Sequence, residues 1–133
     1  MVSFFFFIYI LSGLRYYIII KSLKGLNVME RMAWKGKIKA GCKAEYVRRH
    51  NEIWPEMVQV LKDAGISNYT IFNTGDELFG YYECEKGIAY AEKTQAQSPV
   101  VDRWNEYMKD ILELEMDKET GAQPKLAPVF RLD

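Results

Sequence analysis

The chain has 133 residues, of which 49% are apolar and 27% charged, and its 18 basic residues equal its 18 acidic ones. This length and composition indicate one globular domain and exclude a largely disordered chain. The charge balance lacks the positive excess that nucleic-acid-binding proteins carry, so we expect no nucleic-acid partner.

Residues 1–28 differ in character from the rest of the chain. They are mostly apolar, include four consecutive phenylalanines, and are interrupted by Arg15. A membrane anchor or a signal peptide would explain the apolar run, but an arginine lies inside it and no positive charge precedes it. A T-rich non-coding stretch would encode four phenylalanines. We therefore predict that residues 1–28 are translated upstream sequence, that the start is Met29 or Met32, and that residues 29–133 form the domain. A membrane partner is expected only if the extension is real.

The first predicted elements of the domain are a strand and a broken helix. Residues 32–39 alternate apolar with polar or small side chains, which predicts a strand. Residues 43–64 have the composition and apolar spacing of a helix, but Pro55 lies inside this segment. We therefore predict two helices with a break between Asn51 and Pro55, the second of which is capped by Gly65. The expected apolar stripe consists of Ala44, Val47, Ile53, Met57, Val60, Leu61 and Ala64.

The second half of the domain reads as a hairpin, two helices and a last strand. Residues 67–73 and 78–83 are β-branched and aromatic runs separated by a glycine-containing turn, which predicts a hairpin. Residues 88–95 are expected to form a short helix. A second helix is expected to begin at Ser98 and Pro99 and to run to about Met116. Residues 129–132 are predicted to form an edge strand.

This order of strand, helix, strand, strand, helix and strand predicts a fold of the α+β class. It is the ferredoxin-like arrangement, an antiparallel sheet with helices on one face. A domain of about 100 residues buries only a modest core, and the other face of the sheet needs a cover. A second copy of the chain would supply that cover, so we expect a homodimer.

The two cysteines, Cys42 and Cys84, are far apart in the sequence and have no second metal ligand at a typical spacing. With one histidine in the chain, a zinc site is disfavoured, and no glycine-rich phosphate loop is present. We therefore expect neither a metal nor a cofactor. A disulfide between the cysteines stays open, but two reduced thiols in a cytoplasmic protein are the preferred interpretation.

The most informative side chain is His50, the one histidine of the chain. Imidazole exchanges protons near neutral pH more readily than any other side chain. Tyr46 lies four residues earlier, on the same face of the predicted helix. A phenol and an imidazole in this relation can exchange protons with a ligand, although such a pair is more often a packing contact. Arg48 and Arg49 could bind an anion, but surface pairing with the neighbouring glutamates is the preferred interpretation.

A second candidate cluster lies on the last predicted helix. Trp104 and Tyr107, three residues apart, share a helix face. Such an aromatic stripe usually belongs to the core, yet an indole beside the amide of Asn105 also suits a sugar ring. Tyr69, on the second predicted strand, could add a hydroxyl group to this site.

Three phrases of the sequence resemble the L-rhamnose mutarotase family: YVRRHNEIWPE at 46–56, LKDAGISNY at 61–69 and DRWNEYM at 102–108. The likeness extends over residues 32–132 in one register. It implies the dimeric α+β barrel form of the ferredoxin-like fold. It also implies an isomerase that interconverts the α and β anomers of L-rhamnose without a cofactor or metal.

The resemblance also implies a role for each candidate residue. The family's catalytic proton donor falls on His50, its sugar-contacting tyrosines on Tyr46 and Tyr69, and its aromatic sugar contact on Trp104. Asn105 stands where well-known members carry a second tryptophan, so this wall of the pocket departs from the family pattern. We predict that His50 protonates the ring oxygen, with Tyr46 or a water molecule as the complementary group.

Two other functions stay open at this point. The dimeric α+β barrel also occurs in small monooxygenases that use haem or no cofactor, since one fold can carry several functions. A sugar-binding module without catalytic activity would also accommodate the aromatic residues.

Overall fold

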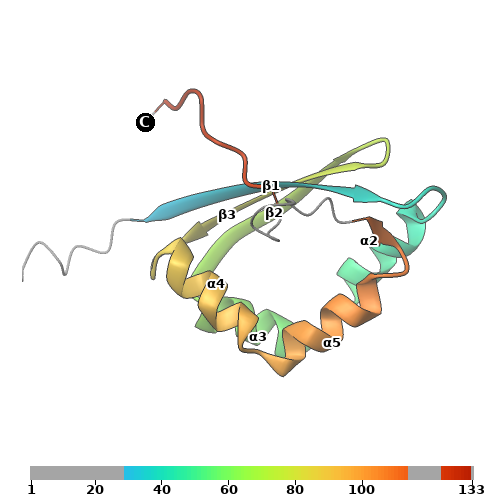
Figure 1. Cartoon of the computed structure of the whole chain (residues 1–133), viewed down its shortest axis with the longest axis horizontal. Coiled ribbons are helices and arrows are strands. Elements are labelled where there is room, and N and C mark those ends of the chain that lie inside the picture. Colours follow the sequence, from blue (N-terminus) through green and yellow to red (C-terminus); the bar gives the residue numbers. More distant parts are fainter. Residues whose placement is uncertain (1–28, 114–123, 133) are drawn as a thin grey trace, which may run out of the picture.

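The computed structural model describes residues 29–113 and 124–132, so the prediction for residues 1–28 lies outside the described residues. A four-stranded antiparallel sheet has the strand order β2-β3-β1-β4. The helices cover one face of this sheet, and the C-terminal segment leaves on the other side (Figure 1). This arrangement confirms the predicted α+β fold. The elements are β1 (Glu30–Ile38), α2 (Lys43–Asn51), α3 (Pro55–Asp63), β2 (Ile66–Thr74), β3 (Glu77–Cys84), α4 (Ile88–Ala96), α5 (Pro99–Met108) and β4 (Leu112–Glu113).

The predicted break in the long helix is confirmed. Helix α2 ends at Asn51, and α3 begins with Pro55 at its first turn. Trp54 is extended, with ψ of 134°, because the proline ring excludes the helical conformation of the residue before it. Gly65 follows α3 with φ of 80°, the left-handed conformation predicted for its cap.

The two central strands place alternate side chains on the two faces of the sheet. In β3, Leu78, Gly80 and Tyr82 are buried under the helices, whereas Phe79 and Tyr81, which alternate with them, are only half-buried. In β1, Trp34 and Ile38 face the same core. The predicted hairpin is confirmed, since β2 and β3 pair from Thr74 and Glu77 outward.

Two predictions about the end of the chain are wrong. Helix α5 ends at Met108 instead of continuing to Met116, and the last strand is β4, whereas residues 129–132 form no strand. The predicted residues 114–116 lie outside the described part. The free edge of β1 is already occupied, by β4 at one end and by Lys125 and Leu126 farther along. The chain therefore meets the sheet before it reaches residue 129.

The predicted apolar stripe is wrong for α2. Ala44 and Val47 are exposed, and α2 buries Tyr46 and Arg49 instead. A charged side chain faces the interior here because it forms ion pairs with α2 itself and with the end of α5. In α3 the stripe is correct for Met57, which is 6% exposed.

Candidate active site

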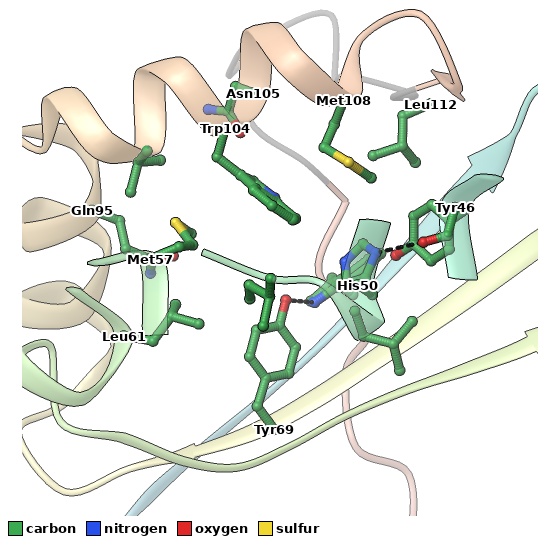
Figure 2. Close-up of a pocket in the computed structure, with 14 residues that line it drawn as sticks. Tyr46, His50, Met57, Leu61, Tyr69, Gln95, Trp104, Asn105, Met108 and Leu112 are labelled. Carbon is green, nitrogen blue, oxygen red and sulfur yellow. Dashed lines mark hydrogen bonds between the residues drawn. The ribbon is translucent and has the colours of Figure 1, made fainter. Parts of the chain in front are cut away.

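A cavity of about 390 Å³ lies between the sheet and the helices. Its volume falls in the range of roughly 300–1,000 Å³ that is usual for small-molecule sites. The residues predicted from the sequence come together here, although they belong to three separate elements (Figure 2). The predicted residues that line the cavity are Tyr46, His50, Tyr69, Trp104 and Asn105.

One end of the cavity carries an imidazole and a phenol, and the other carries two apolar side chains and one amide. The imidazole of His50 and the phenol of Tyr46 stack with ring centroids 4.2 Å apart and an interplanar angle of 31°. Met57 and Leu61 from α3 lie at the opposite end, with Gln95 of α4 beside them (Figure 2). A ligand with one hydroxylated and one apolar end would match this division.

The hydrogen bond of His50 fixes the tautomer of its ring. Nδ1 lies 3.1 Å from the backbone carbonyl of Tyr46. A carbonyl oxygen only accepts, so Nδ1 carries the hydrogen, and in the neutral ring Nε2 has a lone pair. Burial lowers the pKa of His50 below its ordinary value of 6.5, and the bond to the carbonyl only partly opposes this effect. At neutral pH, Nε2 is therefore a base.

The two tyrosines keep their protons at neutral pH. Tyr46 is 6% exposed, and burial raises the pKa of its phenol well above the ordinary value, with a smaller contribution from nearby Tyr69. The Tyr69 residue is 38% exposed, but its hydroxyl points inward to Trp34, and burial raises its pKa as well. Both phenols can therefore donate a hydrogen bond.

Trp34 controls the direction in which Tyr69 donates. The indole Nε1 of Trp34 donates to the hydroxyl oxygen of Tyr69 over 3.2 Å. An indole N–H has no acceptor capacity, so the hydrogen of the Tyr69 hydroxyl is left for another partner. Gly80 makes this arrangement possible, because a Cβ at this position would lie 2.0 Å from the indole ring.

A β-bulge in β2 turns Tyr69 toward the cavity. Ser67 pairs with Glu83 and Thr70 with Tyr81, so β2 has one residue more than β3 in this interval. Asn68 accommodates the bulge with φ of 48°. Without the extra residue, strict alternation from Ile66 would place Asn68 on the helix side and Tyr69 on the outer face. Bulges often redirect a side chain next to an active site.

Trp104 closes the cavity from the helix side. Its indole is 8% exposed and meets the His50 ring edge-on, with centroids 5.5 Å apart. Trp54, from the break between α2 and α3, meets the same indole edge-on at 5.2 Å. Asn105 is exposed and lies at the edge of the cavity, beside the point where Trp104 enters it (Figure 2).

Comparison with known proteins now decides the family. A family model described as L-rhamnose mutarotase matches residues 31–132. The chain belongs to the L-rhamnose mutarotase family.

Individual mutarotases agree with this assignment over nearly their whole length. The L-rhamnose mutarotase of Leptothrix cholodnii is 36% identical over an alignment that covers 78% of this chain and 97% of that protein. The L-rhamnose mutarotase of Mesorhizobium japonicum is 42% identical over 71% and 90% of the two chains. The crystal structure of an L-rhamnose mutarotase from Formosa agariphila superposes with a TM-score of 0.63 at 31% identity, and covers 78% of this chain and 99% of that one.

Two of the cavity residues that carry a polar group, Trp34 and Gln95, are not among those predicted from the sequence. Trp34 lies on a strand whose alternation could have indicated that it faces inward, but nothing local marks its contact with Tyr69. Gln95 is the second, and its side-chain nitrogen donates to the carbonyl of Ala91, which leaves the amide oxygen for another partner. Gln95 lies on a short helix with little apolar periodicity, so nothing in the sequence around it indicates that it faces a cavity.

Other features of the described residues concern metals, membranes and thiols. Among residues 29–113 and 124–132, no three His, Cys, Asp or Glu side chains are grouped to hold a metal ion. Within the same ranges, no helix has the length and apolar character to cross a membrane. Cys42 and Cys84 are both free thiols, and Cys84 is fully buried.

Proposed function

We propose that this enzyme interconverts the α and β anomers of L-rhamnose by opening and closing the sugar ring. The observation that carries the proposal is the pairing of a neutral imidazole with two protonated phenols around one cavity. Ring opening needs one group that accepts a proton and another that donates one, and these side chains supply both. Membership of the L-rhamnose mutarotase family supports the choice of sugar.

The proposed first step is a concerted proton transfer. Nε2 of His50 takes the proton of the anomeric hydroxyl, the bond between C1 and the ring oxygen breaks, and a phenol protonates the ring oxygen. We assign that donor role to Tyr69, because its oxygen already accepts from Trp34. After rotation about C1–C2, the hydroxyl that contains the former ring oxygen attacks the other face of the aldehyde and returns its proton to the Tyr69 phenolate. The protonated Nε2 of His50 gives its proton to the carbonyl oxygen, which becomes the anomeric hydroxyl again.

This assignment revises the hypothesis drawn from the sequence. There, His50 protonates the ring oxygen and Tyr46 or a water molecule is the complementary group. Because the pKa of His50 lies below 6.5, the imidazole is neutral at neutral pH, so it accepts a proton first and donates it later. The two schemes differ in the oxygen at which His50 acts, the ring oxygen or the anomeric oxygen, and in its partner, which is now Tyr69.

The shape of the cavity suggests how the sugar lies. L-rhamnose carries a methyl group in place of a hydroxymethyl group, and Met57 and Leu61 offer it an apolar end. The anomeric carbon then lies near His50, with the pyranose face against Trp104. Asn105 and Tyr46 are proposed as hydrogen-bonding partners of the sugar hydroxyls.

Saturation-transfer NMR of the L-rhamnose anomers tests this proposal on the full chain. Wild-type protein is expected to accelerate magnetisation transfer between the α and β signals, and His50→Asn to reduce this acceleration by at least about 100-fold. Circular dichroism of the variant controls for its fold. Exchange at the wild-type rate in a folded His50→Asn variant would refute the assignment.

We also propose that the enzyme is a homodimer of cytoplasmic location in which residues 29–133 form the domain. Exposed apolar side chains support a partner: Phe72 on β2 is 61% exposed, and Val129 and Phe130 are almost fully exposed. The free thiols of Cys42 and Cys84 suit a reducing compartment. Light scattering during size-exclusion chromatography tests the dimer, which requires twice the chain mass of 15.6 kDa.

A further inference from the structure

Arg49 is a charged residue buried next to the proposed base. It is 9% exposed, and it precedes His50 on α2. Its Nε donates to Glu45 over 2.7 Å on the same helix. Its two terminal nitrogens reach α5 and the turn after it, where they bind both carboxylate oxygens of Asp110 at 2.7 and 3.0 Å. Planar bidentate pairs of this kind are the most directional ion pairs in proteins.

The same guanidinium caps the end of α5. Nη1 of Arg49 donates to the backbone carbonyl of Tyr107. In a continuing helix that carbonyl would accept from the amide of Ile111, four residues later. Here the Ile111 amide bonds instead to Met108, at 3.1 Å. Arg49 therefore takes the place of the next helical hydrogen bond at the point where α5 ends.

The capped end of α5 is part of the wall that faces His50. The guanidinium lies over the Tyr107 ring, 4.3 Å from its centroid. That ring contacts Trp54 at 5.4 Å and Trp104 at 5.9 Å. Trp104 in turn meets the His50 ring. The bonds of Arg49 thus close a loop of contacts that runs from α2 to α5 and back to the imidazole.

We propose that Arg49, together with Asp110, is a positioning residue that fixes the separation of His50 and Trp104. Arg49 does not line the cavity, and each of its three guanidinium nitrogens already donates to a protein group. It acts through its neighbours and does not touch the sugar. This inference rests on the proposed function, in which His50 exchanges protons with a sugar held against Trp104.

The neighbouring arginine provides a matched control. Arg48 also pairs with two carboxylates, those of Glu45 and Glu52, and donates to the hydroxyl of Tyr107 over 3.3 Å, but it is exposed and none of these bonds reaches a backbone carbonyl of α5. Arg49→Gln is expected to lower kcat for anomer exchange by at least tenfold and to change KM by less than threefold. Arg48→Gln is expected to leave kcat within twofold of wild type. Arg49→Lys, which can still donate to Tyr107 or Asp110, should recover part of the loss.

A spectroscopic readout separates positioning from a loss of stability. The chain contains one histidine, so tag-free protein gives a single set of imidazole signals. Arg49→Gln should shift these signals in protein that circular dichroism shows to be folded, whereas Arg48→Gln should not. A folded Arg49→Gln variant with kcat within twofold of wild type and unchanged imidazole signals would overturn the inference.

A second variant covers the case in which Arg49→Gln does not fold. Asp110 is exposed, so Asp110→Asn removes the bidentate partner and leaves the bond to the Tyr107 carbonyl in place. It should lower kcat about threefold with an imidazole shift, and unchanged values would equally overturn the inference. If wild-type protein did not accelerate anomer exchange, the proposed function itself would fail, whatever the Arg49 variants do, and if His50→Asn retained full exchange, the role of His50 would fail.

Discussion

The two walls of the cavity are held by different kinds of interaction. The helix wall, which carries His50 and Trp104, depends on the ion pair of buried Arg49 with exposed Asp110 and on aromatic rings that meet edge-on. The sheet wall, which carries Tyr69, depends on a bulge in the strand ladder and on one indole–phenol hydrogen bond. The helix wall therefore places the base, whereas the sheet wall sets the direction in which the proton donor points. Separate changes in the two walls should give separable effects on catalysis.

Among changes in the sheet wall, removal of the Tyr69 hydroxyl is expected to slow anomer exchange the most. Tyr69→Phe keeps the ring and removes the hydroxyl hydrogen that we assign to the sugar's ring oxygen. Anomer exchange should fall by about 100-fold, the usual lower value for a general acid. Saturation-transfer NMR measures the loss. If Tyr69→Phe retained more than half of the wild-type rate, Tyr46 would become the better candidate for this role.

A pH profile tests the base on the helix wall. Burial lowers the pKa of His50 below 6.5 in the folded protein, so the neutral ring is favoured there. The value of kcat/KM should be level near neutral pH and should fall up to tenfold per pH unit below the folded pKa, because protonated Nε2 cannot accept a proton.

The same shift makes a prediction about stability. The neutral ring is favoured in the fold, so stability is highest above pH 6.5 and decreases as the pH falls toward the folded pKa. In His50→Asn this contribution is absent, and chemical denaturation of both proteins between pH 7 and pH 5 measures it. An equal decrease in the two proteins would contradict the lowered pKa.

Gly80→Ala tests the packing beneath Trp34. The new Cβ would lie 2.0 Å from the indole, so the ring or the strand must move. Overpacking of a core typically costs about 1–3 kcal/mol of unfolding free energy. Urea denaturation should show a loss of at least this size. Gly75→Ala, where no atom lies within 4 Å of the new Cβ but φ is 57°, measures the cost of a left-handed alanine without a steric clash.

The smallest expected effect concerns the hydrogen bond that orients Tyr69. Trp34→Phe removes the N–H donor and should slow exchange by about threefold to tenfold, the worth of one hydrogen bond. In a Tyr69→Phe background the same change should cost less than twofold, because the bond is already lost. Equal losses in both backgrounds would mean that Trp34 acts by packing alone.

The features that could be predicted from the sequence are those set by neighbouring residues in the chain. The break before Pro55, the cap at Gly65 and the hairpin all follow from residues that act on their own backbone, and the structure has each of them. The end of α5 could not be predicted in this way. The carbonyl of Tyr107 there accepts from Arg49, which lies 58 residues earlier in the chain and gives no local signal.

The candidate site also combines residues whose positions follow from local sequence with residues that are brought together by distant contacts. Tyr46 and His50 share a helix face, so their spacing alone brought them together. Tyr69 points into the cavity only because of the bulge at Asn68, which reverses simple alternation along the strand. Trp34 lies 35 residues from Tyr69, and no local pattern marks their contact. Tyr69 and Trp104 were connected to His50 mainly by the resemblance to the family.

The central claim is that His50 works as a neutral base through Nε2. Nitrogen-15 NMR of the single imidazole, followed through a pH titration with and without L-rhamnose, tests it most directly. We expect a hydrogen on Nδ1, a pKa of His50 below 6.5 in the free enzyme, and a response of the Nε2 signal to the sugar. A hydrogen on Nε2 at neutral pH, or a pKa above 6.5, would contradict it.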